Sequence, residues 1–173
     1  MKKYKLTTDT KMWFGHRLFR IQALIDFGDV KKGDLGGYVE KEDNLSHNDK
    51  AWVYGDALVY GDALVYGSAW VYGNAQVCGN AQVYGDAQVY GGALVCGDAD
   101  YLCFKGLGSC NRNTTFYKTE DNGISVVCGC FNGTLDEFIA KVQDTHGDSK
   151  YAKEYLAAVE VVKIHFELED HNE

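Results

Sequence analysis

A short glycine-containing stretch in the second half of the chain, "FKGLGSCNRNTTFYK", has the residue types of an anion-binding loop. Glycines let the backbone approach a ligand closely, lysine and arginine supply positive charge, and threonine hydroxyls donate hydrogen bonds. The spacing matches neither a P-loop nor the dinucleotide fingerprint, so an ordinary loop between strands is the alternative. The predicted ligands of this loop are an anion or a nucleotide phosphate, and its candidate binding residues are Lys105, Gly106, Gly108, Arg112, Thr114, Thr115 and Lys118.

Six cysteines form the second group with chemical potential. Cytosolic cysteines are usually thiols, so we expect free thiols rather than disulfides. The C-x6-C and C-x-C spacings in the second half do not match a zinc knuckle, and four thiols around zinc are the alternative. We therefore predict no metal site and no cofactor. The cysteines are Cys78, Cys96, Cys103, Cys110, Cys128 and Cys130.

The region from Ala51 to Asp98 repeats the six-residue word A-x-V-[YC]-G-[DNSG] eight times. In a strand, the Ala and Val of each word point to one face, and the x and Tyr or Cys residues point to the other. Glycine followed by Asp or Asn suits a corner with a positive φ angle. The expected fold class is mainly β: a three-sided, left-handed parallel β-helix with 18 residues per coil and a small C-terminal α+β module.

The same period predicts columns of outward aromatic side chains, with neighbouring rings about 4.8 Å apart. A soluble monomer seldom leaves so large an apolar surface bare, so we expect these faces to dock against another surface. That surface is either a terminal module or a second copy of the chain, in a trimer or a dimer. The predicted interaction surface comprises Trp52, Trp70, Tyr54, Tyr72, Tyr90, Tyr66 and Tyr84.

The segment before the repeat is expected to cap one end of the rod, as repeat arrays require. Within residues 1–50, alternating apolar residues predict a strand or hairpin from about Trp13 to Leu24. Val39 and Leu45 are six residues apart and predict an irregular first coil. Residues 51–100 then form the regular β-helix.

The segment after the repeat, residues 101–173, predicts a compact α+β module. Three short strands are expected first, with "EDNG" as a hairpin turn. Two helices follow, and the first has a capping box from Thr134 and Glu137 and a stop at Gly147. Residues 162–168 fit a strand and further helix equally well.

Charge is spread unevenly along this chain, whose net charge is −8. Residues 51–100 contain five Asp and no Lys or Arg, and a surface without cations cannot neutralise phosphates, which disfavours nucleic acid as a partner. No apolar run approaches 18 residues, and the N-terminus lacks the apolar part of a secretion signal. These features predict a soluble, cytoplasmic protein with no membrane partner.

The stretch "RLFRIQALIDFGDVKKGDLGGYVEKEDNLS", followed by the "AxVYG[DN]" words, resembles hexapeptide-repeat left-handed β-helix proteins of bacteria and prophages. Members of that family are often labelled as transferases, and the resemblance covers about residues 1–100. The part from "CFKGLGS" to "THGDSKYAKEY" is similar to a module found beside such repeats in phage-derived proteins. The resemblance implies the β-helix, whereas the transferase label rests on fold analogy.

Acyltransferases of this kind place a histidine beside the β-helix as a general base, and residues 51–98 contain no histidine. We therefore assign no catalytic residue. We expect a non-catalytic binding protein of phage or prophage origin, a rigid scaffold that presents the C-terminal module. A counter-defence role would follow from blocking a host protein or sequestering a small nucleotide signal. The alternative is an acyltransferase that uses acyl-CoA, with His47 or His146 as the base.

Overall fold

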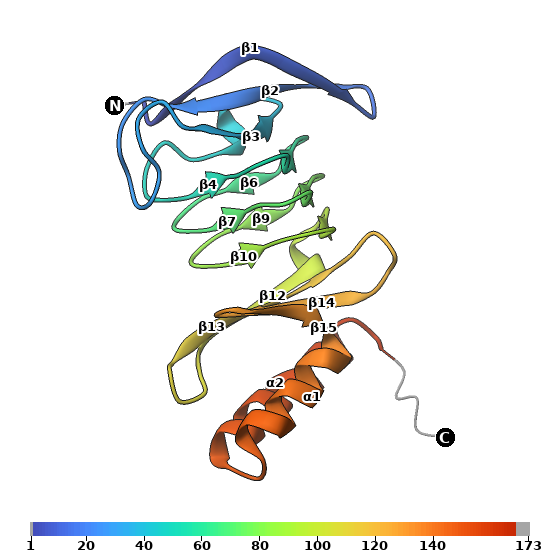
Figure 1. The fold of residues 1–173 in the computed structure, drawn as a ribbon. Coiled ribbons are helices and arrows are strands. Elements are labelled where there is room, and N and C mark those ends of the chain that lie inside the picture. Colours follow the sequence, from blue (N-terminus) through green and yellow to red (C-terminus); the bar gives the residue numbers. More distant parts are fainter. Residues whose placement is uncertain (1, 169–173) are drawn as a thin grey trace. The chain divides into compact units, whose positions relative to one another are not determined.

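The computed structural model describes residues 2–168 and divides the chain into two compact units, the first ending at Asp98 and the second beginning at Ala99 (Figure 1). The first unit contains the repeat and its N-terminal cap. The second is a small module of strands and helices. The chain is thus mainly β, with a β-solenoid followed by an α+β module.

The repeat forms a solenoid with three short strands in each coil. Each strand is the x–Val pair of one six-residue word, and parallel pairing joins Val53 to Val71 and Val71 to Val89, 18 residues at a time. The predicted period of the coil is therefore confirmed. The strands are β4 (Trp52–Val53), β5 (Leu58–Val59), β6 (Leu64–Val65), β7 (Trp70–Val71), β8 (Gln76–Val77), β9 (Gln82–Val83), β10 (Gln88–Val89) and β11 (Leu94–Val95).

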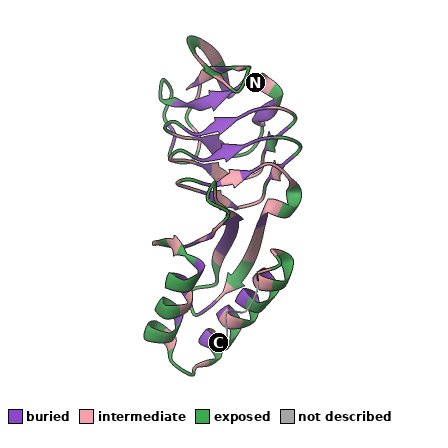
Figure 2. Cartoon of the chain, turned by 90° about the vertical axis from the view of Figure 1, so that its right-hand side faces the viewer, coloured by how far each residue is buried: buried purple, intermediate pink, exposed green. Residues whose placement is uncertain are grey.

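Alanine and valine fill the interior of the solenoid, as predicted. The Ala and Val of all eight words have at most 1% of their surface exposed, and Figure 2 shows several strands of the repeat as buried. Burying one valine side chain stabilises a fold by roughly 1.5–3 kcal/mol. Backbone bonds join the coils: the N–H of Tyr54, for example, donates to the carbonyl of Val71 at 2.8 Å.

The N-terminal cap closes the first coil. Strand β3 (Leu35–Val39) pairs in parallel with β5, which places Val39 beside Val59. Leu45 follows a short 3-10 turn, η1 (Glu42–Asn44), and forms a bridge with Val65. Val39 and Leu45 are both buried and pair with the first regular coil.

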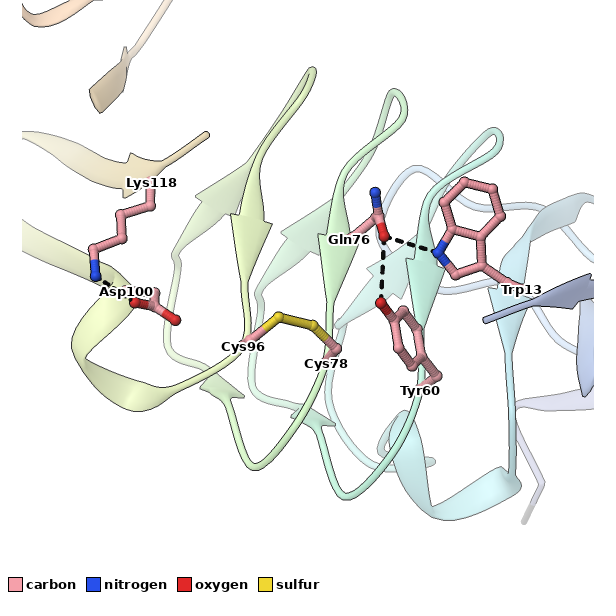
Figure 3. The surroundings of a disulfide bond; sticks show 7 residues. All are labelled: Trp13, Tyr60, Gln76, Cys78, Cys96, Asp100 and Lys118. Carbon is pink, nitrogen blue, oxygen red and sulfur yellow. Dashed lines mark hydrogen bonds and ion pairs between the residues drawn. A yellow bond between two sulfur atoms is a disulfide. The ribbon is translucent and has the colours of Figure 1, made fainter. Parts of the chain in front are cut away.

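A long antiparallel hairpin of β1 (Tyr4–Trp13) and β2 (His16–Ala23) extends this sheet through β3. The sequence predicted only its second half, because β1 is rich in exposed polar residues. The tip of the hairpin covers the outer face of the solenoid, where the Trp13 indole donates to the side-chain oxygen of Gln76 at 2.9 Å (Figure 3). The Tyr60 hydroxyl donates to the same oxygen at 3.3 Å.

The second unit contains a four-stranded antiparallel sheet, one strand more than predicted. Its strands, in spatial order, are β12 (Tyr101–Leu107), β13 (Arg112–Lys118), β14 (Ile124–Cys128) and β15 (Phe131–Thr134), preceded by the 3-10 turn η2 (Asp98–Asp100). The predicted turn at "EDNG" joins β13 to β14 and is confirmed. The added strand, β15, is only four residues long and includes a glycine, so it carries little strand signal.

Two helices pack on this sheet, α1 (Leu135–His146) and α2 (Lys150–His165). The predicted capping box of Thr134 and Glu137 and the stop at Gly147 are both present. The ambiguous segment 162–168 is helical as far as His165 and then turns, so the strand alternative is wrong. The shared core is built around Phe116, Phe138 and Val159. Within the described residues, neither helix is long and apolar enough to cross a membrane.

Cys78 and Cys96 are joined by a disulfide, contrary to the expectation of free thiols (Figure 3). The physical reason is the register of the solenoid. The two residues are 18 positions apart, so they occupy the same place in successive coils, and their Cα atoms lie 4.3 Å apart. The register predicts this juxtaposition, whereas the inference from the cytosolic environment was wrong.

Candidate functional site

The predicted anion loop is not assembled in the structure, because its threonines lie inside the module. Thr114 and Thr115 are buried in β13, with at most 1% of their surface exposed. The Thr114 hydroxyl donates to the sulfur of Cys128 at 3.2 Å, and that of Thr115 to the sulfur of Cys103 at 3.6 Å. The threonine part of the prediction is therefore wrong: the two residues point to opposite faces of β13, and both faces are buried at this place in the strand.

Other groups of the predicted loop also contact the protein itself. The backbone N–H of Gly108 donates to the Glu154 carboxylate at 3.1 Å, and the Lys118 ammonium lies 2.8 Å from Asp100. The carboxylates of Glu154 and Asp100 thus bind the groups that were predicted to bind an anion. Of the predicted set, Arg112 lines a pocket among the described residues.

That pocket lies within the second unit and has a volume of about 360 Å³. Phe138 and Tyr155 in its wall are buried, whereas Arg112 and Lys141 are exposed. It therefore combines an apolar interior with cations that face the solvent. The side chains that give it this character are three thiols, three rings and three basic groups: Cys110, Cys128, Cys130, Phe131, Phe138, Tyr155, Arg112, Lys141 and His146.

Arg112 is held against the Cys-Gly-Cys turn between β14 and β15. Gly129 has a φ of +61°, and a Cβ at this position would overlap the Arg112 guanidinium. The turn therefore needs glycine both for its backbone and for the space the arginine fills. Hydrogen bonds to the sulfurs of Cys130 and Cys110 raise the pKa of Arg112 above its ordinary value. One guanidinium thus lies beside two exposed thiols.

Tyr155 forms the inner wall of the pocket from helix α2. Its hydroxyl donates to the Leu107 carbonyl at 3.3 Å, and the Cys128 thiol contacts the same hydroxyl at 3.7 Å. Burial, and then the bond with Cys128, raises the pKa of Tyr155. The phenol therefore stays neutral and keeps the inner end of the pocket free of negative charge.

His146 is placed at the pocket by the end of helix α1. Its ring stacks on Tyr155, with centroids 5.8 Å apart and planes 26° apart. His146 therefore adds an imidazole ring to the wall of the pocket.

The predicted aromatic columns are present on the outer faces of the solenoid. Tyr66 and Tyr84 are stacked 5.2 Å apart with planes at 9°, and Tyr72 lies 4.5 Å from Tyr90 and 6.5 Å from Tyr54. Burial raises the pKa of both Tyr54 and Tyr72, so these hydroxyls stay protonated in the physiological range. The Tyr66–Tyr84 column is the more open one, since Tyr84 is 53% exposed.

Trp52 is not part of an exposed surface and must be removed from the predicted set. It is 1% exposed because the cap covers it: its ring lies 5.3 Å from that of Phe27 and 6.1 Å from that of Tyr4. Trp70, one coil further, is half-buried and packs edge-on against Tyr54. The cap thus serves as the docking partner at the first coil.

His47, one of the two alternative bases, is enclosed by the cap. Its Nδ1 accepts from the backbone N–H of Lys3 at 3.2 Å, and its ring stacks on Tyr4 at 4.3 Å. Its Nε2 is buried and lies 3.8 Å from the Glu42 carboxylate. Since Nε2 is buried and Nδ1 accepts a backbone hydrogen bond, this geometry disfavours His47 as a general base.

No sequence motif indicated the pocket, because its side chains come from turns and helices that are far apart in the chain. In the folded chain, the Arg112 guanidinium lies against the Cys-Gly-Cys turn. Among residues 2–168, no three His, Cys, Asp or Glu side chains form a group that could hold a metal ion. The zinc alternative therefore has no support in the geometry.

Comparison with known proteins bears on the repeat alone. The family model described as "YdcK Beta solenoid repeat" matches residues 59–73, 75–91 and 81–97. A search of curated proteins found no match. The matched residues are the regular coils, whose Val-to-Val register the structure shows directly. The chain is a β-solenoid repeat protein.

Proposed function

We propose that this chain is a binding protein, with the solenoid as a rigid support and the second unit as the ligand-binding module. The observation that carries the proposal is the pocket of about 360 Å³ with buried rings and exposed cations. Small-molecule sites are typically concave, largely apolar and provided with a few polar groups that orient the ligand. Phe138 and Tyr155 would contact an aromatic body, and Arg112 and Lys141 an anionic group.

The ligand class that fits these walls is a small aromatic anion, and a mononucleotide is the first example to test. A planar base is suited to packing against aromatic rings, and arginine forms paired hydrogen bonds with phosphate. Sequestration of a small nucleotide signal by a phage-encoded cytoplasmic protein, as a form of counter-defence, belongs to this proposal. The sequence resemblance to prophage proteins supports that origin.

The proposal includes self-association through the β6–β9 face of the solenoid. Leu64 and Tyr84 on this face are 37% and 53% exposed, and the Tyr66 ring stacks on the Tyr84 ring of the next coil. An exposed apolar strip of this kind is typical of protein–protein contacts. A dimer or trimer would bury it, and light scattering of the Tyr84→Ser variant against the wild type tests this part.

The test of ligand binding is calorimetric titration of the full chain with AMP. Replacing Arg112 by Gln should weaken binding about tenfold or more, since a hydrogen bond to a charged group contributes roughly 1.5–3 kcal/mol. Lys141→Gln should have a smaller effect. The matched control is Lys153→Gln, which removes the same charge from an exposed site outside the pocket and should leave binding unchanged. Equal weakening in all three variants would show mere charge attraction and refute the pocket.

An acyltransferase with His146 as the base is the second candidate, because His146 lines the pocket. Such an enzyme would place the acceptor hydroxyl or amine within hydrogen-bonding distance of the imidazole. Turnover of acyl-CoA that disappears in His146→Ala would support it. Absence of turnover with a panel of acceptors would leave the binding proposal.

A further inference from the structure

The pocket carries two exposed thiols beside a cation, an arrangement that a purely non-covalent binding site does not need. Cys110 lies in the turn between β12 and β13, and Cys130 in the turn between β14 and β15. Both are exposed and both line the pocket together with Arg112, whose guanidinium packs against Gly129 in the turn that carries Cys130. Two hairpin turns that are distant in sequence thus bring two thiols to the same guanidinium.

We propose that Cys130 and Cys110 form a thiol pair that undergoes exchange with small anionic disulfides bound in this pocket. The proposal rests on the proposed function only in using the same pocket and the same preference for anions. The thiolate is the species that attacks a disulfide. The cations Arg112 and Lys141 attract the anionic reagent.

The reaction balances without any further oxidant. The Cys130 thiolate attacks one sulfur of the disulfide RS–SR, a new S–S bond forms, and RS⁻ leaves with the electron pair of the broken bond. The Cys110 thiolate then attacks the Cys130 sulfur and releases the second RS⁻. Two protein thiols are oxidised, one disulfide is reduced to two thiols, and the two protons that the protein thiols lose go to the released thiolates in water.

Cys128 and Cys103 serve as internal controls, since both belong to the same module and have different surroundings. Cys128 is buried and contacts the hydroxyls of Thr114 and Tyr155. Cys103 is half-buried on β12, where the Thr115 hydroxyl contacts it. Both residues are less exposed than Cys110 and Cys130, so slower reaction is expected at both.

The experiment measures reaction of the full chain with dithiobis-nitrobenzoate, an aromatic disulfide with two carboxylates, and with cystamine, a cationic disulfide. Peptide mass mapping assigns the modified cysteines. Relative to a small free thiol, Cys130 should prefer the anionic reagent over the cationic one by roughly tenfold or more, because two cations face it. Arg112→Gln should remove most of this preference, and Arg112→Lys should restore part of it, whereas Lys153→Gln should not change it.

The stoichiometry tests the pairing. Wild type should release two nitrothiolates and end with a Cys110–Cys130 disulfide, whereas Cys110→Ser should release one and retain the mixed disulfide on Cys130. A preference that is the same at Cys103, or unchanged in Arg112→Gln, would overturn the proposal. So would a stable mixed disulfide in wild type.

Failure of this inference and failure of the proposed function are distinguishable in the double variant Cys110→Ser/Cys130→Ser. If the double variant still binds AMP while the wild-type thiols show no selectivity, the exchange reaction is refuted and the binding proposal stands. If AMP does not bind and the selective exchange persists, the nucleotide ligand is refuted and the thiol site stands.

Discussion

One corner column of the solenoid offers a test of how tightly the coils stack. Gly55, Gly73 and Gly91 occupy the same position in successive coils, and all three have positive φ angles, between +61° and +76°. An added Cβ would find different surroundings at each. At Gly73 it would lie 2.9 Å from the backbone N and 3.2 Å from the Cα of Gly91, at Gly55 nothing is closer than 3.7 Å, and at Gly91 nothing lies within 4 Å.

The expected costs follow from two separate terms. A left-handed conformation costs alanine about 1–2 kcal/mol, and the reduced entropy of the unfolded chain returns about 0.4–1 kcal/mol. Gly55→Ala and Gly91→Ala should therefore each destabilise the solenoid by about 1 kcal/mol. Gly73→Ala adds a backbone overlap that the next coil must relieve, at about 1–3 kcal/mol more. Its total should be about 2–4 kcal/mol.

Urea unfolding followed by tryptophan fluorescence measures these costs. All three tryptophans, Trp13, Trp52 and Trp70, belong to the first unit, so the signal reports on the solenoid and its cap. A reductant should be present so that the Cys78–Cys96 bond does not limit unfolding. An extra 2 kcal/mol lowers the midpoint by roughly 1 M urea if the slope is about 2 kcal/mol per M.

The three variants separate stacking from fraying of the last coil. If stacking governs the cost, Gly73→Ala is the most destabilising and the other two are equal. If the last coil frays, Gly91→Ala is the mildest and Gly55→Ala costs as much as Gly73→Ala. The second pattern, or three equal costs, would refute the close approach of the coils at Gly73.

Three further predictions concern the cap, the second unit and the disulfide. Burial lowers the pKa of Lys3 from 10.5 to about 8. Between these two pH values the unfolded chain binds more protons than the folded chain, so the free energy of unfolding should rise from pH 8 to 9.5. This rise should be absent in Lys3→Met. Thr134→Ala removes the N-cap of α1 and should lower the stability of the second unit by about 1 kcal/mol, whereas Thr145→Ala, inside the same helix, should not destabilise it, as far-UV circular dichroism can show. Reducing the bond between Cys78 and Cys96, which closes 18 residues, should destabilise the first unit by about 3 kcal/mol in urea titrations with and without reductant.

The regular part of the fold could be predicted from sequence because one word determines each side of the coil. The Val and Ala positions predict the interior of the coil, and the glycine predicts its corner. Three sides of six residues predict the register that pairs Val53 with Val71. The same register placed Cys78 beside Cys96. Whether the two sulfurs are bonded depends on oxidation, which the word does not encode, and there the prediction was wrong.

The cap and the pocket were predicted less well, for different physical reasons. Strand β1 has little apolar alternation, since it extends the sheet mainly through backbone pairing with β2, which is insensitive to side-chain type. The pocket depends on convergence: Arg112 from β13, Cys130 from a turn and Tyr155 from α2 meet only after the sheet and helices pack. Local spacing therefore suggested Thr114 and Thr115 as ligand-binding residues, although both are buried in the folded module.

This contrast explains why the candidate chemistry lies in the second unit and not on the repeat. Translation by one coil places equivalent residues in columns, so a side chain on the solenoid has similar side chains above and below it, as Tyr66 has Tyr84. A column of like groups makes a surface for association, whereas a site for a small ligand needs unlike groups around one point. The second unit supplies these from its strands, turns and helices, where basic groups, thiols and aromatic rings surround one cavity. Function in this chain should therefore respond to single substitutions around Arg112, and association should respond to substitutions along the Tyr66 column.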